Sequence, residues 1–160
     1  MSLEPPLDGR LFGEDQPCFG CGPRHPAGFH LAFTVDGDDV VTRFTPDSRY
    51  QGPPGLMHGG LVATLADELA AWVLVVKKGK FGFTAKMDLR FRAGLRIGLP
   101  VEGRGRLRRD GRRVVHIDVV LRQGETVCAE GDLTFVVLDQ PGAERLLGGP
   151  IPEAWQRFCR

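Results

Sequence analysis

Two carboxylates stand inside an otherwise apolar stretch of this sequence, and they are its clearest candidates for chemistry. Asp67 and Glu68 lie within residues 60–76, where almost every other residue is apolar or small. A buried carboxylate costs free energy unless it is hydrogen-bonded, paired or protonated. It can also activate water as a general base or attack a substrate directly. Asp67 is the preferred candidate because its helix-face neighbours are mostly small. The alternative is a structural aspartate bonded to the backbone or to Thr64.

The sequence His58-Gly59-Gly60 stands directly before this apolar run. Glycines at the start of a helix let a ligand or another backbone approach closely, and the first amides of a helix have no partner within it. The Gly60 amide could therefore bind the partly negative oxygen of a polarised carbonyl. His58 could orient a ligand or bond to a backbone carbonyl. The alternative is that the glycines only allow a tight turn into the helix.

The spacing of these groups bears on how they can act together. Asp67 follows His58 by nine residues, which corresponds to about 13 Å along one helix. A single chain cannot easily place both groups around one substrate. In a two-fold dimer, Asp67 of one subunit can face Gly60 of the other.

Composition limits the class of protein. The chain has 160 residues, a net charge of +1 and four cysteines, which fits one domain with a core and no strong field favouring nucleic acid. We expect no membrane partner, because no apolar run is long enough to span a bilayer, which needs roughly 20 residues. The start of the sequence does not read as a signal peptide. A reduced, cytoplasmic protein is expected.

The hydrophobic pattern predicts the elements that position these groups. A helix is expected over about residues 60–77, and alternating patterns predict strands at 29–35, 40–44, 84–92, 101–109, 113–122 and 126–138. One apolar helix and one antiparallel sheet with an apolar face can only bury each other. We therefore predict an α+β fold in which a single antiparallel sheet wraps around a long central helix.

The predicted domain spans residues 18–138. An irregular N-terminal arm is expected at 1–17, and a C-terminal tail at 139–160 with a short helix within 152–158. In the strand at 84–92, alternation assigns two faces. One face carries Ala85, Met87, Leu89 and Phe91, and the other carries Thr84, Lys86, Asp88, Arg90 and Arg92.

A Cys-x-x-Cys motif at Cys18 and Cys21 raises the question of metal binding. Together with His25 and His30 it offers two thiolates and two imidazoles, a tetrahedral zinc set. The gap between Cys21 and His25 is shorter than in zinc fingers. We therefore expect a reduced structural turn, with no metal and no cofactor.

Arginines recur along the later strands. Arg90 and Arg92 share one strand face, as do Arg104 and Arg106 on another strand. An exposed basic patch of this kind could bind phosphates. The alternative is the solvated face of a one-sided sheet.

The motifs together resemble the hotdog-fold acyl-CoA thioesterases of the PaaI type, in the 4-hydroxybenzoyl-CoA thioesterase superfamily. The resemblance rests on His58-Gly59-Gly60 with an acidic residue nine positions after the histidine. It also rests on the segments from Gln51 to Met57, Thr84 to Phe91 and Cys18 to Pro23. It covers about residues 18–138.

The resemblance implies a hotdog fold, a homodimer or dimer of dimers, and hydrolysis of an acyl-CoA thioester. It implies that Asp67 is the base or nucleophile, that the Gly60 amide polarises the carbonyl, and that His58 and Gln51 orient substrate or water. Further substrate contacts are expected from Gly59, Glu68, Thr84, Arg90, Arg104 and Arg106. Two other functions stay open: an acyl-CoA-binding sensor without catalysis, and a hotdog hydratase or dehydratase. The latter usually needs a catalytic histidine on or near the central helix.

Overall fold

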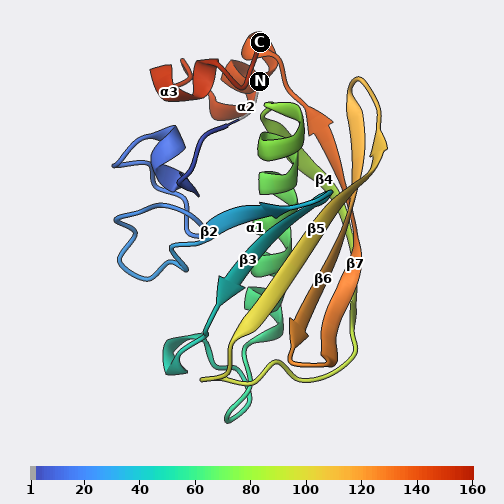
Figure 1. Cartoon of the computed structure of the whole chain (residues 1–160). Helices are drawn as coiled ribbons and strands as arrows, with labels where there is room; N and C mark the ends of the chain where they lie inside the picture. Colours follow the sequence, from blue (N-terminus) through green and yellow to red (C-terminus); the bar gives the residue numbers. More distant parts are fainter. Residues whose placement is uncertain (1–2) are drawn as a thin grey trace.

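A computed structural model describes residues 3–160 of the chain. Seven strands form one antiparallel sheet in the order β1-β2-β3-β5-β6-β7-β4, which curves around the long helix α1 (Figure 1). The predicted α+β architecture is confirmed. The strands are β1 (Leu7–Asp8), β2 (Ala32–Asp36), β3 (Asp39–Phe44), β4 (Gly82–Phe91), β5 (Val101–Asp110), β6 (Val114–Gln123) and β7 (Thr126–Val137). The helices are α1 (Gly59–Lys78), α2 (Gln140–Leu147) and α3 (Glu153–Gln156), with 3-10 turns η1 (Gly9–Phe12) and η2 (Ser48–Tyr50).

Helix α1 fills the concave side of the sheet. Leu65, Leu69 and Val73 are completely buried, and the backbone of β5 lies close to them. A Cβ atom added at Gly105 would lie 2.6 Å from Val73 Cγ2, so this glycine lets the strand approach the helix. The helix ends at Gly79 in the left-handed conformation, with φ of 61°, which glycine adopts without strain.

By length and composition alone, α1 could cross a membrane. It has 20 residues and a mean hydropathy of 1.7 over its best window, so the expectation that no apolar run is long enough is wrong. Half of that window is buried inside the protein. A helix that is surrounded by the core of a globular domain needs the same composition, so the sheet accounts for its hydrophobicity.

Strand β4 forms one edge of the sheet and contains an irregularity. Its register against β7 shifts between Thr84 and Lys86, as expected for a β-bulge at Ala85. The bulge reverses the alternation, so Thr84 stands opposite the buried Phe135 and points toward α1. The predicted placement of Thr84 on the outer face with Lys86 is therefore wrong.

The first long strand begins later than predicted. His30 has a φ of 51°, which interrupts an extended chain. The amides of Phe29 and Leu31 donate to the carbonyls of Phe19 and Gly20 at 3.0 Å each. Residues 29–31 therefore hold the cysteine loop in place, and β2 starts only at Ala32.

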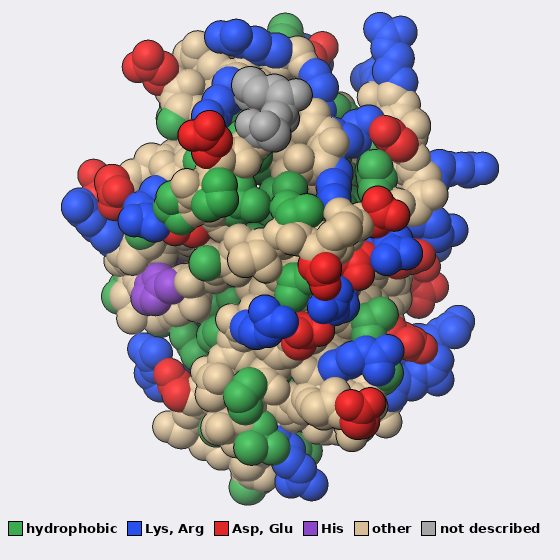
Figure 2. Space-filling model, viewed as in Figure 1, with side chains coloured by type: hydrophobic (Ala, Val, Ile, Leu, Met, Phe, Trp, Pro, Cys, Tyr) green, Lys and Arg blue, Asp and Glu red, His purple; other side chains and the backbone are tan. Residues whose placement is uncertain are grey.

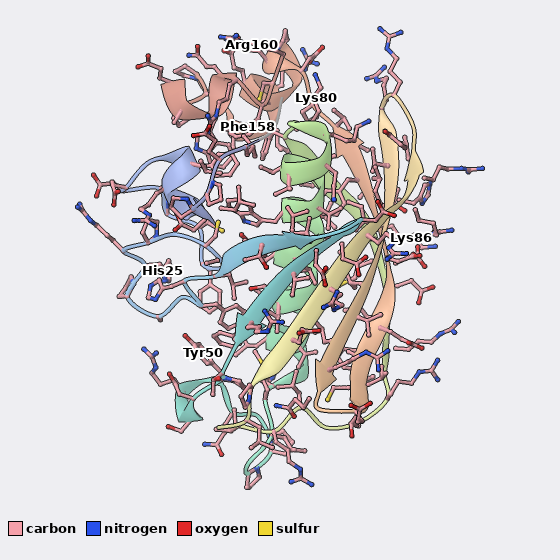
Figure 3. The ribbon with its side chains drawn as sticks, viewed as in Figure 1. His25, Tyr50, Lys80, Lys86, Phe158 and Arg160 are labelled. Carbon is pink, nitrogen blue, oxygen red and sulfur yellow. The ribbon has the colours of Figure 1, made fainter. Side chains whose placement is uncertain are left out.

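The described part of the N-terminal arm and the C-terminal tail pack together at the C-terminal end of α1 (Figure 1). The N-terminal arm contains β1 and η1, and both Leu7 and Phe12 are buried. In the tail, Trp155 donates from Nε1 to the Phe12 carbonyl at 3.1 Å. Phe158 is completely buried, and its carbonyl accepts from the Phe81 amide at 2.7 Å. These contacts close the end of the barrel-like sheet near Lys80 (Figure 3).

Candidate active site

Asp67 lies half-buried on α1 with one side-chain partner. Thr84 Oγ1 donates to Asp67 Oδ1 at 2.7 Å, because the bulge in β4 turns Thr84 inward. Burial raises the pKa of Asp67 above its ordinary value, and the hydrogen bond from Thr84 opposes part of this rise. A carboxylate that is fixed by a hydrogen bond, partly desolvated and raised in pKa is suited to act as a general base. The structure therefore brings two of the predicted site residues into contact.

The start of α1 carries an unusual cap. His58 Nδ1 accepts a hydrogen bond from the Gly60 amide at 2.9 Å. The His58 carbonyl accepts from the amides of Leu61 and Val62. The Gly60 amide, predicted to bind a substrate carbonyl, therefore already has an acceptor. Over residues 3–160 the hydrogen bonds include none from the Gly59 amide, which leaves Gly59 as the open donor of the first turn.

Asp67 and Gly60 lie on one helix but do not meet. They are seven residues apart, close to two full turns, so they share a face and lie about 10 Å apart along the axis. Between them the same face carries Ala63 and Thr64, and Thr64 Oγ1 donates to the Gly60 carbonyl at 2.9 Å. Reacting groups must approach to about 3–3.5 Å. In one chain, Asp67 and the Gly60 amide are therefore held too far apart to act on one atom.

Gln51 lies on the exposed loop that packs against His58. Its Oε1 accepts from the Gly55 amide at 2.8 Å, and its Nε2 donates to the Ser48 carbonyl at 3.2 Å. The side-chain amide of Gln51 thus bonds only to the backbone of its own loop among the described residues. Its predicted contact with substrate or water stays a prediction, and it would require at least one of these bonds to open.

Glu68 faces away from Asp67 and joins a separate cluster. Its two carboxylate oxygens lie 3.5 and 3.6 Å from Cys18 Sγ. Trp72 Nε1 donates to Oε1 at 3.1 Å. Burial, with the nearby charge of Cys18, raises the pKa of Glu68 to about 8. Its contact with substrate stays a prediction, and no hydrogen bond in residues 3–160 links it to Asp67.

The two thiols of the motif affect one another. A hydrogen bond from the Cys21 thiol lowers the pKa of Cys18 to about 5. The same hydrogen bond and burial raise the pKa of Cys21.

The histidines of the predicted zinc set do not join the thiols. His25 Nδ1 accepts from the Ala27 amide at 3.2 Å, and Figure 3 places His25 on the outer loop. His30 Nε2 lies 2.6 Å from the His25 carbonyl oxygen. Within the described chain, Cys18 and Cys21 meet Glu68 instead. The sequence offered one signal for this contact, since a carboxylate in an apolar helix needs a polar partner.

The predicted arginine patch lies among carboxylates. Arg104 forms ion pairs with Asp36, Asp39 and Glu102, and Arg106 pairs with Asp39. Figure 2 shows basic and acidic side chains interspersed over this face. Arg90 is exposed on β4, beside a surface hollow that Asp88, Asp118, Glu130 and Asp132 also line. These surroundings favour the solvated outer face of a sheet, and a phosphate would have to compete with the carboxylates.

Comparison with known proteins agrees with the fold. A family model described as thioesterase superfamily matches residues 54–130. A solved thioesterase superfamily protein is 25% identical, with a TM-score of 0.69 over 83% of this chain and 70% of the other. A phenylacetic acid degradation-related thioesterase protein from Ralstonia eutropha is 22% identical, with a TM-score of 0.66 over 80% of this chain and 97% of the other. A Streptococcus mutans protein bound to acetyl-CoA is 21% identical, with a TM-score of 0.62 over 67% and 87%.

The search of curated proteins gives no match. The long helix under a single antiparallel sheet defines a hotdog-fold protein. Residues 54–130 match the model of the thioesterase superfamily, and the predicted resemblance to hotdog-fold, PaaI-like thioesterases is confirmed. The matched residues contain the helix cap, Asp67 and Thr84, whereas the Cys18–Cys21 motif lies outside them.

Proposed function

We propose that this protein hydrolyses an acyl-CoA thioester to a free acid and CoA. One observation carries the proposal: the carboxylate of Asp67 is held by Thr84 at 2.7 Å on the small-residue face of the central helix. The match of this region to the thioesterase superfamily supports the choice of reaction. The bound acetyl-CoA in the Streptococcus mutans structure supports the choice of substrate class.

In the proposed reaction, ionised Asp67 removes a proton from water, which attacks the thioester carbonyl carbon. A carbon–oxygen bond forms and the carbon–sulfur bond breaks. The thiolate of CoA leaves and takes up a proton. Alternatively, Asp67 attacks directly and water then hydrolyses the resulting anhydride. Both routes need the same carboxylate in its ionised form.

The carbonyl oxygen needs donors, which the start of α1 supplies. The open Gly59 amide and the Gly60 amide both belong to the first helical turn, where a partial positive charge develops. An oxyanion donor of this kind lowers the barrier by about 3 kcal/mol. His58 would release the Gly60 amide by turning its ring away, and it would then be placed to orient substrate or water.

The proposed site is shared between two protomers, because Asp67 and Gly60 of one chain are too far apart to reach one carbonyl. Strand β4 supports this proposal, since it has ten residues and pairs only with β7 along the described sheet. A long open edge strand is a ready surface for pairing. Phe83 and Phe91 on this strand are 50% and 57% exposed. A homodimer, or a dimer of dimers, would cover them.

The other predicted substrate contacts fit the proposal as follows. Arg90, Arg104 and Arg106 would bind CoA phosphates after exchanging their present carboxylate neighbours. Gln51 would orient substrate or water from the loop beside His58. Glu68 borders a small cavity with Trp72 rather than the Asp67 face, so it would contact an acyl group only if that group entered the cavity.

The experiment is release of free CoA from a panel of short, medium, long and aromatic acyl-CoAs by the full-length protein. The proposal expects hydrolysis of at least one class, and the best substrate defines the acyl preference. Folded protein that binds acyl-CoA tightly but releases no CoA would replace the proposal with the binding-protein alternative. An enoyl-CoA in the same panel tests the hydratase alternative, although α1 contains no histidine. Loss of the enoyl absorbance without CoA release would favour that alternative.

A further inference from the structure

Cys18, Cys21 and Glu68 form a cluster, here called the thiol cluster, that the proposed hydrolysis does not use. One ligand atom from each residue lies within 4.8 Å of the other two. Cys21 is only 6% exposed. The cluster connects the N-terminal loop to the central helix, across 50 residues of sequence between Cys18 and Glu68. Three polar groups thus converge at a buried place, where each of them needs a polar partner.

The separation between Cys18 and Glu68 matches that of two neighbouring ligands of a tetrahedral zinc ion. Zinc lies about 2.3 Å from a cysteine sulfur and about 2.0–2.2 Å from a carboxylate oxygen, so neighbouring sulfur and oxygen ligands are about 3.5–3.7 Å apart. Cys18 Sγ lies 3.5 and 3.6 Å from the two Glu68 oxygens. The Cys-x-x-Cys spacing is itself typical of a zinc-binding turn.

Hydrogen bonds from neighbouring residues hold the thiol cluster in place. Gln16 Nε2 lies 3.5 Å from Cys21 Sγ, while its Oε1 accepts from the Cys18 amide at 2.9 Å. Trp72 holds Glu68 from the other side. Fixed outer hydrogen bonds of this kind orient the ligands of metal sites.

The close packing of the loop on Glu68 depends on a glycine. A Cβ atom added at Gly20 would lie 2.4 Å from Glu68 Cδ. The loop can therefore bring both sulfurs against the carboxylate only because position 20 has no side chain.

When its groups are ionised, the thiol cluster carries negative charge that a bound cation would neutralise. None of the ion pairs in the described chain includes Glu68. Two thiolates and a carboxylate without a basic partner would strongly repel one another. Protons can neutralise them, but a divalent cation neutralises them and satisfies the soft sulfur donors at the same time.

We propose that Cys18, Cys21 and Glu68 bind one zinc ion that fastens the N-terminal loop to α1. Two thiolates and one carboxylate form a donor set suited to this borderline-soft cation. All three residues border a cavity of about 130 Å³ that is otherwise mostly apolar, with Phe12, Trp72 and Trp155 among its walls. Water occupies about 30 Å³ per molecule in the liquid, so the cavity can hold a water as the fourth ligand. Binding replaces the thiol protons, which pass to solvent.

The experiment is metal analysis of the full-length protein purified under reducing conditions, followed by cobalt substitution after chelation. The wild type should retain about one zinc per chain and show thiolate-to-cobalt charge-transfer absorption. Cys18→Ser should lose both signals. Glu68→Gln keeps the side-chain shape and both thiols, and it should weaken zinc binding by about a hundredfold or more, beyond the typical effect of an outer-shell change. Zinc should also raise the Tm of the wild type and leave that of Cys18→Ser unchanged.

Cys128→Ser is the matched control, because Cys128 is also a buried free thiol but lies on β7 away from the cluster. It should bind zinc as the wild type does. Reduced, folded wild type that binds neither zinc nor cobalt overturns the proposal, as does Cys18→Ser with undiminished zinc. A Cys18–Cys21 disulfide that forms equally fast with and without added zinc also overturns it. If Cys18→Ser fails to fold, the affinity of Glu68→Gln decides.

Discussion

Thr84→Val is the most informative small change near the proposed catalytic carboxylate. The substitution keeps the branched shape and deletes the hydroxyl that donates to Asp67 Oδ1 at 2.7 Å. A hydrogen bond to a charged group contributes about 1.5–3 kcal/mol, and partial exposure of the pair favours the lower end. About 1.4 kcal/mol corresponds to a tenfold change in an equilibrium. The ionised form of Asp67 should therefore become about tenfold less favoured.

The sign of the effect follows from the cause of the pKa shift. Burial raises the pKa of Asp67, and the Thr84 hydroxyl counteracts this rise. Removing the hydroxyl should raise the pKa further. A general base or carboxylate nucleophile works only when ionised. The acid limb of the pH profile should therefore move to higher pH, with kcat/KM reduced about tenfold on that limb and much less on the plateau.

The assay is kcat/KM for CoA release as a function of pH, for wild type, Thr84→Val and the control Thr134→Val. Thr134 also uses its hydroxyl for a side-chain contact, at 3.2 Å from His116 Nδ1, but it lies on the outer face of the sheet. The control should leave the profile in place. If the midpoint of the acid limb is unchanged in Thr84→Val, or lies at lower pH, the assignment of Asp67 as the ionised catalytic group held by Thr84 is refuted.

Three further predictions follow from the same structure. Phe83, which is 50% exposed on the open edge strand, should be covered by a second protomer, so Phe83→Glu should shift the protein toward monomer in light scattering and reduce hydrolysis. An unchanged mass would argue against pairing at this edge. Gly20→Ala would place a Cβ 2.4 Å from Glu68 Cδ and should lower the free energy of unfolding by about 1–3 kcal/mol. Gly149→Ala, where a Cβ meets nothing within 4 Å, is the control, and equal losses in both would contradict this reasoning. Burial raises the pKa of Asp67, so wild-type stability should fall as pH rises from about 3.9 through the folded-state pKa. The Tm advantage of Asp67→Asn should grow over that window, and a constant difference in Tm would contradict it.

The central helix was predictable because its composition leaves few alternatives. An apolar run with no polar face must be surrounded, and the alternating strands after it supply the surrounding sheet. The end of the helix also follows from local signals. The positive charges of Lys77 and Lys78 interact favourably with the negative end of the helix dipole. Gly79 adopts the left-handed conformation that caps the helix.

The face of β4 on which Thr84 lies could not be predicted from the alternation of apolar and polar residues. The bulge between Thr84 and Lys86 carries no glycine or proline that would mark it, and only pairing with β7 reveals it. The cap formed by His58 was hidden for a similar reason, because histidine is not among the usual capping residues. Both features depend on where neighbouring elements place the backbone.

The C-terminal tail contains signals for a second helix, in addition to the short helix predicted within 152–158. Asp139 caps α2 through Gly142, Pro141 lies in its first turn, and Gly148 ends it in the left-handed conformation. These residues follow the usual start and stop pattern of a helix. The meeting of Cys18 with Glu68 is different, since it joins distant parts of the chain, and spacing alone suggested histidines instead.

The most direct test of the central claim is a comparison of acyl-CoA binding and hydrolysis in wild type and Asp67→Asn, with Asp88→Asn as an exposed control on the same edge strand. We predict that Asp67→Asn binds acyl-CoA within a few-fold of wild type while kcat falls by at least about a hundredfold, the scale of a catalytic acid or base. Asp88→Asn should keep both. Undiminished hydrolysis by Asp67→Asn would contradict the account and move the chemistry away from this carboxylate.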